Sequence, residues 1–364
     1  MQISYKIIRW LHAWLGLALA LFVLLASSTG TLLIWKEDYV KWITPEAQVN
    51  FRPTPEALAQ IAEAVEAQFA DDFVLNIRFA TADFPLTRVT LDGTNYAYVD
   101  TTGKVVSRWH MNDRPEEWLY DLHHRLLLDD LGLTIMGVVA VALLVLVILG
   151  LASFIPFRRL FPTGIVPRGT SRAALLTSHR QLGVVLSLPL LMMAVTGFLQ
   201  AFPREVEQWL LEDIRIDIEY SDNMVSGLDT ISGEGTGDWR PAMERTLAVF
   251  PGARIRSAAG SVTSYGSRVI GVQQPGDWNP NGLSFTYIDP ATGHMDLRFD
   301  ALSVPWLERL YNTAYPIHTG KTGSLAYKLF LTLFGLGVAA LSAFGLIGFL
   351  KGRFKQSKSL DRQS

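Results

Sequence analysis

Four histidines are the residues of this chain best suited to chemistry, because each lies at one end of a long apolar segment: His12, His123, His179 and His318. Imidazole is the most common metal ligand among protein side chains. Ionisable residues within or beside a lipid-buried helix are costly, so their presence indicates function. Four histidines on four helices could form two sites, each with two imidazoles facing one metal centre.

The four histidines occur in matched sequence frames. His12 and His179 are each followed four residues later by glycine and eighteen residues later by a second glycine, which is preceded by threonine. His123 and His318 both follow a tyrosine and are each followed 27 residues later by a glycine. The residues that complete these frames are Gly16, Thr29, Gly30, Trp42, Tyr120 and Gly150 in the first half, and Gly183, Thr196, Gly197, Trp209, Tyr315 and Gly345 in the second. The pattern predicts a duplicated helix–loop–helix unit.

The composition is typical of a membrane protein. Hydrophobic residues make up 49% of the chain, charged residues only 18%, and the mean hydropathy is positive at +0.22. Four apolar segments reach the length of about 20 residues that a bilayer requires, at 11–35, 131–155, 180–202 and 325–350. The first segment is too long for a cleaved signal peptide and repeats later in the chain, so we expect it to be retained.

Positive residues predict the orientation, since short cytoplasmic segments are enriched in Lys and Arg. Lys6 and Arg9 precede the first span. The linker between the second and third spans and the tail after the fourth are also basic, with Arg158, Arg159, Arg168, Arg172 and Arg180 in the linker and Lys351, Arg353, Lys355 and Lys358 in the tail. Both termini are therefore predicted to be cytoplasmic, and both long loops periplasmic.

The absence of cysteine from the sequence limits the chemistry. It excludes disulfides, iron–sulfur clusters held by thiolates and covalently attached haem, so that any haem is b-type. No glycine-rich dinucleotide or phosphate-binding motif occurs between a predicted strand and helix. The net charge of −2 gives no indication of a nucleic-acid partner, and none is predicted.

Each long loop is predicted to form one helix on a small antiparallel sheet. In the first loop, Thr54 and Pro55 form a helix start, and strands are expected at 74–79 and 88–91. The second loop has a predicted helix at 241–250 and strands at 254–258 and 267–273. A hairpin with Asp and Gly in turn positions follows in both loops, at 98–104 and 287–294.

These features resemble a known family. The helix, strands and Tyr-Val/Ile-Asp-x-x-Thr-Gly hairpin resemble the PepSY domain, and the segments around the four histidines, such as Leu11-His12-x-x-Leu-Gly16 and Ile317-His318-Thr-Gly320, resemble the PepSY-associated transmembrane family. The likeness covers nearly the whole chain. It implies a haem-containing inner-membrane protein of iron uptake, of the type that reduces ferric siderophores. Some relatives carry a fused flavoprotein domain, and this chain has none, so the electron donor stays open between a quinol and a reductase.

The predicted site residues follow from the direction of the helices. His12 and His179 share the cytoplasmic level and form an inner pair; His123 and His318 share the periplasmic level and form an outer pair. Each pair is predicted to hold one b-type haem through its iron. The inner haem would pack on Gly16 and Gly183 and the outer haem on Gly30 and Gly197, while propionates would bind Arg9 and Arg180 at the inner level and Arg125 and Lys321 at the outer level.

Simpler interpretations of these residues exist. A histidine at a membrane flank can be an interfacial polar residue, the glycines can serve helix packing, and the arginines are first of all positive-inside charges. His124 is adjacent to His123 and is an alternative ligand. His110 and His294 lie in loops without metal-ligand spacing and are expected at the surface.

The predicted fold class is a membrane four-helix bundle, a duplicated unit that carries two extracytoplasmic α+β PepSY-like domains. The expected order is a membrane helix (1–36), a first periplasmic domain (37–119), a second membrane helix (120–157), a cytoplasmic linker (158–177), a third membrane helix (178–203), a second periplasmic domain (204–314), a fourth membrane helix (315–352) and a cytoplasmic tail (353–364).

The predicted function is a di-haem reductase of the bacterial inner membrane that passes electrons to a periplasmic ferric siderophore. Ligation by two histidines leaves no open iron position, which favours electron transfer over oxygen chemistry. Two other functions remain possible: a non-enzymatic PepSY-type regulator anchored by its helices, and an accessory subunit of an iron or siderophore uptake system.

Overall fold

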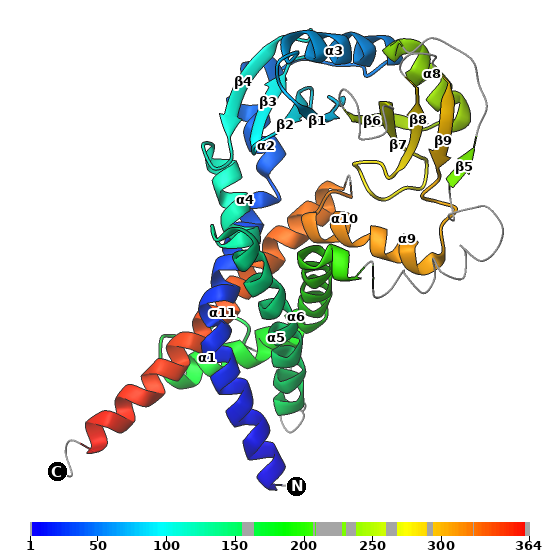
Figure 1. The fold of residues 1–364 in the computed structure, drawn as a ribbon. Helices are drawn as coiled ribbons and strands as arrows, with labels where there is room; N and C mark the ends of the chain where they lie inside the picture. Colours follow the sequence, from blue (N-terminus) through cyan, green and yellow to red (C-terminus); the bar gives the residue numbers. More distant parts are fainter. Residues whose placement is uncertain are drawn as a thin grey trace. The chain divides into compact units, whose positions relative to one another are not determined.

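The computed structural model describes residues 2–154, 164–206, 208, 228–230, 238–259, 268–289, 294–322 and 324–360. It divides into two compact units (Figure 1). The helical unit comprises Met1–Ile34, Leu119–Pro203 and His318–Ser364, and the sheet unit comprises Trp35–Trp118 and Arg204–Ile317. Trp209, Arg158 and Arg159, as well as the second expected turn at 290–293, lie outside the described residues.

The helical unit contains four helices that are long and apolar enough to cross a membrane. They are α1 (Gln2–Leu33), α5 (Asp129–Phe154), α6 (Arg172–Ala201) and α11 (Leu325–Leu360), with the apolar spans at Tyr5–Leu33, Asp129–Phe154, Arg172–Ala201 and Leu325–Gly352. All four spans match the segments expected from the sequence. The short helices α4 (Pro115–Arg125) and α10 (Ala314–Thr319) directly precede α5 and α11.

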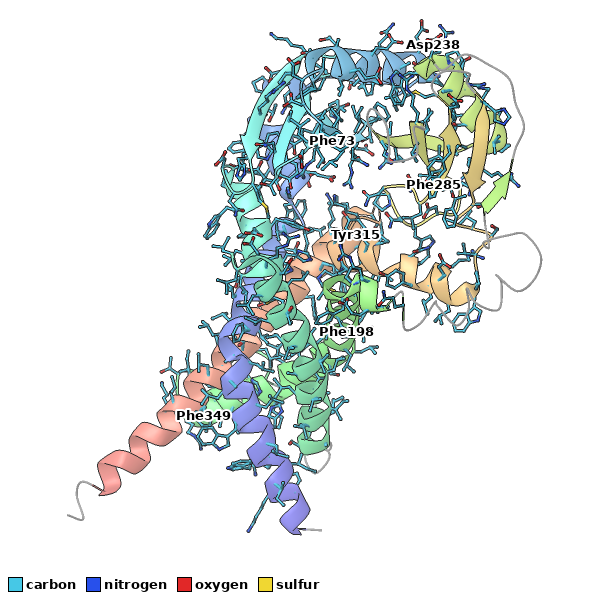
Figure 2. All side chains as sticks on the ribbon, in the orientation of Figure 1. Phe73, Phe198, Asp238, Phe285, Tyr315 and Phe349 are labelled. Carbon is cyan, nitrogen blue, oxygen red and sulfur yellow. The ribbon has the colours of Figure 1, made fainter. Side chains whose placement is uncertain are left out.

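The four long helices form a closed ring. α1 packs against α5 and α11, and α6 packs against the same two neighbours, so that α1 and α6 are diagonal to each other. The interior is apolar, with Leu331, Phe334, Val338 and Leu341 of α11 at its centre. Trp14 of α1 packs edge-on against Phe349 of α11, with ring centroids 5.6 Å apart. Figure 2 labels Phe349 on α11. Many outward leucines are exposed, as expected of helices that face lipid rather than water.

The sheet unit is built on one nine-stranded sheet with the order β4-β3-β2-β1-β6-β7-β8-β9-β5. The first loop supplies β1 (Val74–Arg78), β2 (Thr87–Leu91), β3 (Asn95–Val99) and β4 (Val105–His110); the second supplies β5 (Leu228–Thr230), β6 (Arg254–Ala259), β7 (Arg268–Gln273), β8 (Ser284–Ile288) and β9 (Met295–Phe299). Neighbouring strands of this sheet are antiparallel throughout the residues that the structure describes.

The two loops are joined through their central strands. β1 pairs with β6, with Ile77 opposite Ala258 and Arg78 opposite Ser257. We call this β1–β6 pairing the seam of the sheet. The expected helix-and-strand content of each loop is present, but the expectation of two separate domains is not confirmed, because the sheet and its core continue across the seam. The seam follows from two edge strands that leave their backbone N–H and C=O groups unpaired unless they meet.

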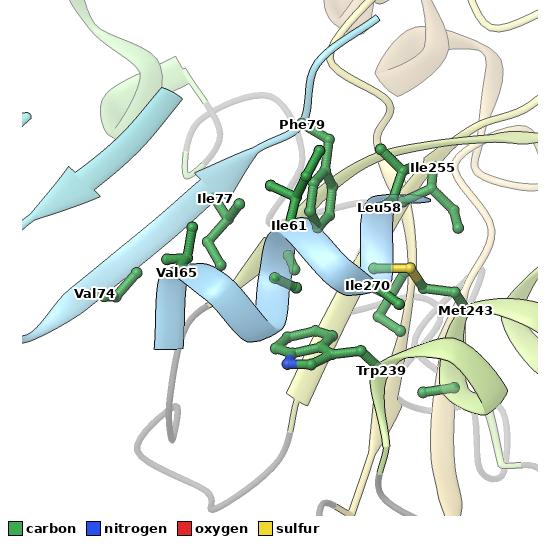
Figure 3. Packing of buried hydrophobic residues seen from close by; sticks show 14 of the residues in the cluster. Leu58, Ile61, Val65, Val74, Ile77, Phe79, Trp239, Met243, Ile255 and Ile270 are labelled. Carbon is green, nitrogen blue, oxygen red and sulfur yellow. The ribbon is translucent and has the colours of Figure 1, made fainter. Parts of the chain in front are cut away.

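One face of the sheet is covered by helices α3 (Pro55–Gln68) and α8 (Trp239–Val249). The helix α3 begins as predicted, because the Thr54 hydroxyl oxygen accepts a hydrogen bond from the Ala57 N–H at 3.2 Å. Leu58, Ile61, Trp239 and Met243 from the two helices meet Ile77 and other buried strand residues in one apolar cluster (Figure 3). This cluster holds both loops together.

Smaller elements complete the sheet unit. Three short helices flank these elements in the sequence. Two precede α3, namely α2 (Lys36–Ile43) and η1 (Pro45–Ala47), and one follows β9, namely α9 (Trp306–Asn312). The first expected turn has the predicted chemistry: the Asp100 carboxylate accepts hydrogen bonds from the N–H groups of Thr102 at 2.8 Å and Lys104 at 3.0 Å, and Gly103 has a φ of +88°.

The seam core should control the stability of the sheet unit. Ile77 is 0% exposed, so Ile77→Ala should destabilise the unit by about 2–5 kcal/mol through lost burial and a residual cavity. Thermal unfolding of the purified protein, followed by tryptophan fluorescence, measures this. The matched control is Leu75→Ala on the same strand, where the side chain is 47% exposed and the expected change is within about 0.5 kcal/mol. Equal destabilisation by the two variants would contradict the assigned core.

Candidate paired-histidine sites

The inner pair meets across the bundle. His12 extends from α1 and His179 from α6, the two diagonal helices, and their ring centroids are 6.1 Å apart with an angle of 60° between the planes. The direction of the helices predicted this pairing, and the structure brings the two rings together.

A backbone carbonyl of the next helix orients each inner imidazole. Nδ1 of His12 lies 3.1 Å from the carbonyl oxygen of Leu146 on α5, and Nδ1 of His179 lies 2.8 Å from that of Leu341 on α11. A carbonyl can only accept, so Nδ1 carries the proton in both rings. In the neutral imidazole the lone pair is then on Nε2, the nitrogen that remains available for a metal.

The outer pair has the same arrangement at the other end of the helices. The ring centroids of His123 and His318 are 6.3 Å apart, with 56° between the planes. Nδ1 of His123 lies 2.9 Å from the Thr29 hydroxyl on α1, and Nδ1 of His318 lies 2.9 Å from the Thr196 hydroxyl on α6. The direction of the helices predicted this pairing as well.

The two threonines also determine the tautomer. The Thr29 hydroxyl donates to the carbonyl oxygen of Leu25 at 2.8 Å, and the Thr196 hydroxyl donates to that of Met192 at 2.9 Å. Each hydroxyl oxygen therefore accepts the Nδ1–H of its histidine. Sequence reasoning noted both threonines in the repeated frame but assigned them no role; they are positioning residues that the frame itself could have revealed.

Each of the four rings lies against a glycine of a neighbouring helix. A Cβ atom on Gly30 would be 3.0 Å from Cε1 of His123, and one on Gly197 would be 3.3 Å from Cε1 of His318. At the inner level, the corresponding distances are 3.0 Å from Gly150 to Cε1 of His12 and 2.9 Å from Gly345 to Cε1 of His179. Glycine at these positions leaves the space that the imidazoles occupy.

At the inner level, the glycines that contact the histidine rings are not the two that the sequence predicted as packing positions. Gly16 and Gly183 contact leucines and no histidine: a Cβ there would lie 3.6 Å from Leu146 and 3.5 Å from Leu341. Their packing against a haem stays a prediction. Gly150 and Gly345 were not included among the site residues, although the 27-residue spacing from His123 and His318 to these glycines was visible in the sequence.

The spacing of the rings fits a metal held between two imidazoles. Bonds of about 2.0 Å from a metal to two imidazole nitrogens leave the ring centroids about 6 Å apart, close to the values of 6.1 and 6.3 Å. Among the described residues, no group of three or more His, Asp or Glu side chains could hold a metal ion. A haem held by such a pair would itself supply the further iron ligands that two histidines lack.

Burial favours the neutral, metal-binding form of the outer histidines. His123 and His318 lie on α4 and α10, outside the four apolar spans. Burial lowers the pKa of His123 to about 4 and the pKa of His318 to about 3, and their histidine neighbours lower these pKa values further. Both rings are therefore neutral near pH 7, as a metal ligand must be.

The structure separates His123 from its neighbour His124. The ring opposite His318 is that of His123, whereas His124 stacks on Tyr120 with centroids 5.3 Å apart. This arrangement favours His123 over His124 as the partner of His318.

The predicted propionate partners lie in different surroundings. Arg125, at the end of α4, has its Nε–H buried with no hydrogen-bond partner among the described residues. A buried donor without a partner is costly, so an anionic group bound there would stabilise it. Arg9 lies over the Tyr5 ring at 5.8 Å, and Arg180 and Lys321 make other contacts within the protein. Arg125 is thus the cation whose environment best fits the prediction.

The two pairs lie near opposite ends of the helices. Thr29, which contacts the outer pair, is 17 residues after His12 on the same helix. At 1.5 Å per residue, this separation corresponds to about 25 Å. Two metal centres at these levels would together reach across most of the roughly 30 Å apolar core of a bilayer.

The glycine contacts make a testable distinction. Gly345→Ala should displace the His179 ring, because the new Cβ would lie 2.9 Å from both Cε1 and Nδ1, whereas Gly183→Ala places its Cβ at an ordinary 3.5 Å from a leucine. We expect Gly345→Ala to lose the inner member of the two predicted low-spin haem signals and Gly183→Ala to retain it. The optical difference spectrum at low temperature measures both. Loss in Gly183→Ala alone would show that the inner cofactor packs on Gly183.

The comparison with known proteins identifies the family. No curated protein matches this sequence. The family model described as the PepSY-associated TM region matches residues 9–351, nearly the whole chain, including all four paired histidines, the second and third spans and most of the first and fourth. The chain is therefore a multi-pass membrane protein that belongs to the family of the PepSY-associated TM region.

Proposed function

We propose that this protein is a di-haem b reductase of the inner membrane that transfers single electrons to a ferric siderophore in the periplasm. The observation that carries the proposal is the pair of facing imidazoles at each end of the bundle, with Nδ1 of every ring engaged. Haem, when bound between two histidines, supplies one-electron iron chemistry without an open coordination position.

The chain's own residues prepare both sites for such a group. The carbonyl oxygens of Leu146 and Leu341 and the hydroxyls of Thr29 and Thr196 hold the four rings by their Nδ1–H groups, which fixes the ring orientation and raises the basicity of Nε2. The apolar interior around Leu331 and Phe334 excludes water. Arg125 offers a buried N–H to an anionic group at the outer level.

Equivalent contacts in the two halves support an internal duplication. α1 and α5 hold His12 as α6 and α11 hold His179, and the Thr29–His123 bond has its counterpart in Thr196–His318. The basic flanks, which include Lys6, Arg9 and Lys351, favour cytoplasmic termini. In that orientation His12 and His179 lie on the cytoplasmic side, and the sheet unit is periplasmic.

The assignment of the substrate rests on the resemblance to ferric-siderophore reductases of this family. One electron from a quinol or a reductase converts chelated Fe(III) to Fe(II). Oxygen ligands that suit the harder Fe(III) hold Fe(II) less tightly, so the metal is released. No side chain needs to act as an acid or base in this reaction.

The first test concerns the cofactor content and the pairing. Pyridine haemochrome analysis should give about two haems b per chain, because two equivalent imidazole pairs are present. His12→Ala and His179→Ala should remove one spectral component, and His123→Ala and His318→Ala the other. A haem content near zero after expression with sufficient haem would refute the proposal, and loss of one common component in His12→Ala and His123→Ala would refute the pairing.

The second test concerns direction and acceptor. Sealed right-side-out vesicles with internal reductant should produce Fe(II) outside when a ferric siderophore is added, and a ferrous chelator detects it. His318→Ala should abolish or strongly slow this reaction, since it removes one ligand from the outer pair. If the reduced wild type is not oxidised by a panel of ferric siderophores but is rapidly oxidised by a quinone, a quinone-linked electron carrier replaces the siderophore reductase.

A further inference from the structure

The seam of the sheet unit brings together charges from the two loops. Ile77, Val89, Ala258 and Ile270 belong to the core under α3 and α8. Since side chains alternate across a sheet, the neighbouring Arg78 lies on the opposite face. On β2–β4 this opposite side is covered by a second apolar cluster that includes Val40, Tyr98 and Trp109. We call the remaining part, on β1 and β6–β9, the open face of the sheet.

The hydrogen-bond register defines one continuous row on the open face. From Arg78 on β1, it runs through Ser257 on β6, Gly271 on β7 and Phe285 on β8 to Phe299 on β9. The middle of this row carries little side chain, because Ser257 is small and Gly271 has none; the Ser257 hydroxyl lies beside Gly271. We call this part of the row, with Ser257 and Gly271, the low strip. With strands about 4.8 Å apart, roughly 14 Å separate the Arg78 and Phe285 backbones across the low strip.

One end of the row is cationic. The register of β6 shifts between Ile255 and Ser257, which places Arg256 at a bulge. Burial lowers the pKa of Arg256; Glu37 and Asp83 raise this pKa, while the positive charges of Arg78 and Arg254 lower it further. Three arginines thus share this end of the row with two carboxylates, which leaves a positive excess. Arg78 and Arg254 are exposed.

The other end of the row is aromatic. Phe285 stacks on Phe299 with ring centroids 5.0 Å apart and 22° between the planes, and Tyr287 packs edge-on against Phe285 at 5.4 Å (Figure 2 labels Phe285). All three rings are half-buried and therefore keep part of their surface accessible. A low strip with cations on one side and aromatic rings on the other suits a ligand that is both anionic and aromatic.

We propose that the open face of the sheet unit binds an anionic ferric chelate of the tris-catecholate class, with Arg78, Arg254 and Arg256 contacting its charge and Phe285 and Phe299 contacting its rings. This inference rests on the proposed function and names the substrate class. A ferric tris-catecholate is anionic because its phenolate oxygens carry more charge than one ferric ion, whereas a ferric tris-hydroxamate is uncharged. The charge on this face therefore distinguishes the two classes.

The test separates binding from electron transfer by using gallium(III), which has the charge of Fe(III) but is not reduced under these conditions. Titration calorimetry on the full-length protein in detergent should show that a gallium tris-catecholate binds more tightly than a gallium tris-hydroxamate, and that added salt weakens only the former. Arg78→Ala and Arg254→Ala should each weaken tris-catecholate binding about tenfold, and together about a hundredfold. Phe285→Leu should also weaken it, because the planar ring is lost while apolar bulk remains.

The matched control is Arg108→Ala. Arg108 lies on β4 on the helix-covered face, paired with Asp72 at 3.2 Å and placed over the Phe69 ring at 4.2 Å, so its loss should leave the affinity unchanged. Equal affinity for the two chelates, unchanged affinity in the double arginine variant, or an equal loss in Arg108→Ala would each overturn the inference. The gallium titration reports on this face alone, whereas the haem content and Fe(II) release report on the proposed function, so the two can fail separately.

Discussion

The hydrogen bond from Nδ1 of each histidine to the neighbouring helix is the interaction on which the helical unit depends. A polar group in a lipid-facing bundle has no water to satisfy it, so it needs a partner within the protein. Leu146 and Leu341 provide backbone carbonyls and Thr29 and Thr196 provide hydroxyls for this purpose. These bonds also leave the lone pair of each ring on Nε2, and glycines of the neighbouring helices leave the space that the rings occupy.

The dependence on glycine explains which part of the site was predictable. Gly30 directly follows Thr29 in the sequence frame that begins at His12. The frame of His12 therefore also contains the glycine against which the His123 ring packs. The pairing of His12 with His179 followed from chain direction and duplication alone. The contacts of Gly150 and Gly345 did not, because they depend on the rotation of α5 and α11 about their axes, and these two helices are apolar on all sides and give no periodic signal.

Most strands of the sheet unit were predictable one by one, but β5 and the joining of the two loops were not. Alternating residues and the Thr54 cap gave the local elements of each loop. The pairing of β1 with β6 joins residues such as Arg78 and Ser257, which are far apart in the sequence, and no local pattern encodes such a contact. The seam nevertheless has a physical reason: it pairs two strand edges and merges two small hydrophobic clusters into one, so that both loops share a core neither could complete alone.

The two halves differ at the corners that lead from the short helices into α5 and α11. In the second half, Gly320 takes the left-handed conformation at a φ of +75° without steric cost. In the first half, Leu126, Leu127 and Asp129 take it at +53°, +60° and +49°, at about 1 kcal/mol or more for each residue. Gly132 accommodates this corner, because a Cβ there would collide with the carbonyl oxygen of Arg125. Strain of this kind persists only where the surroundings enforce it, and it is typical of functional sites. Here it lies directly beyond His123 and the buried, unpartnered Nε–H of Arg125. In the first half, non-glycine residues therefore adopt positive φ beside the outer pair, whereas at the described residues of the second corner the positive φ falls on a glycine.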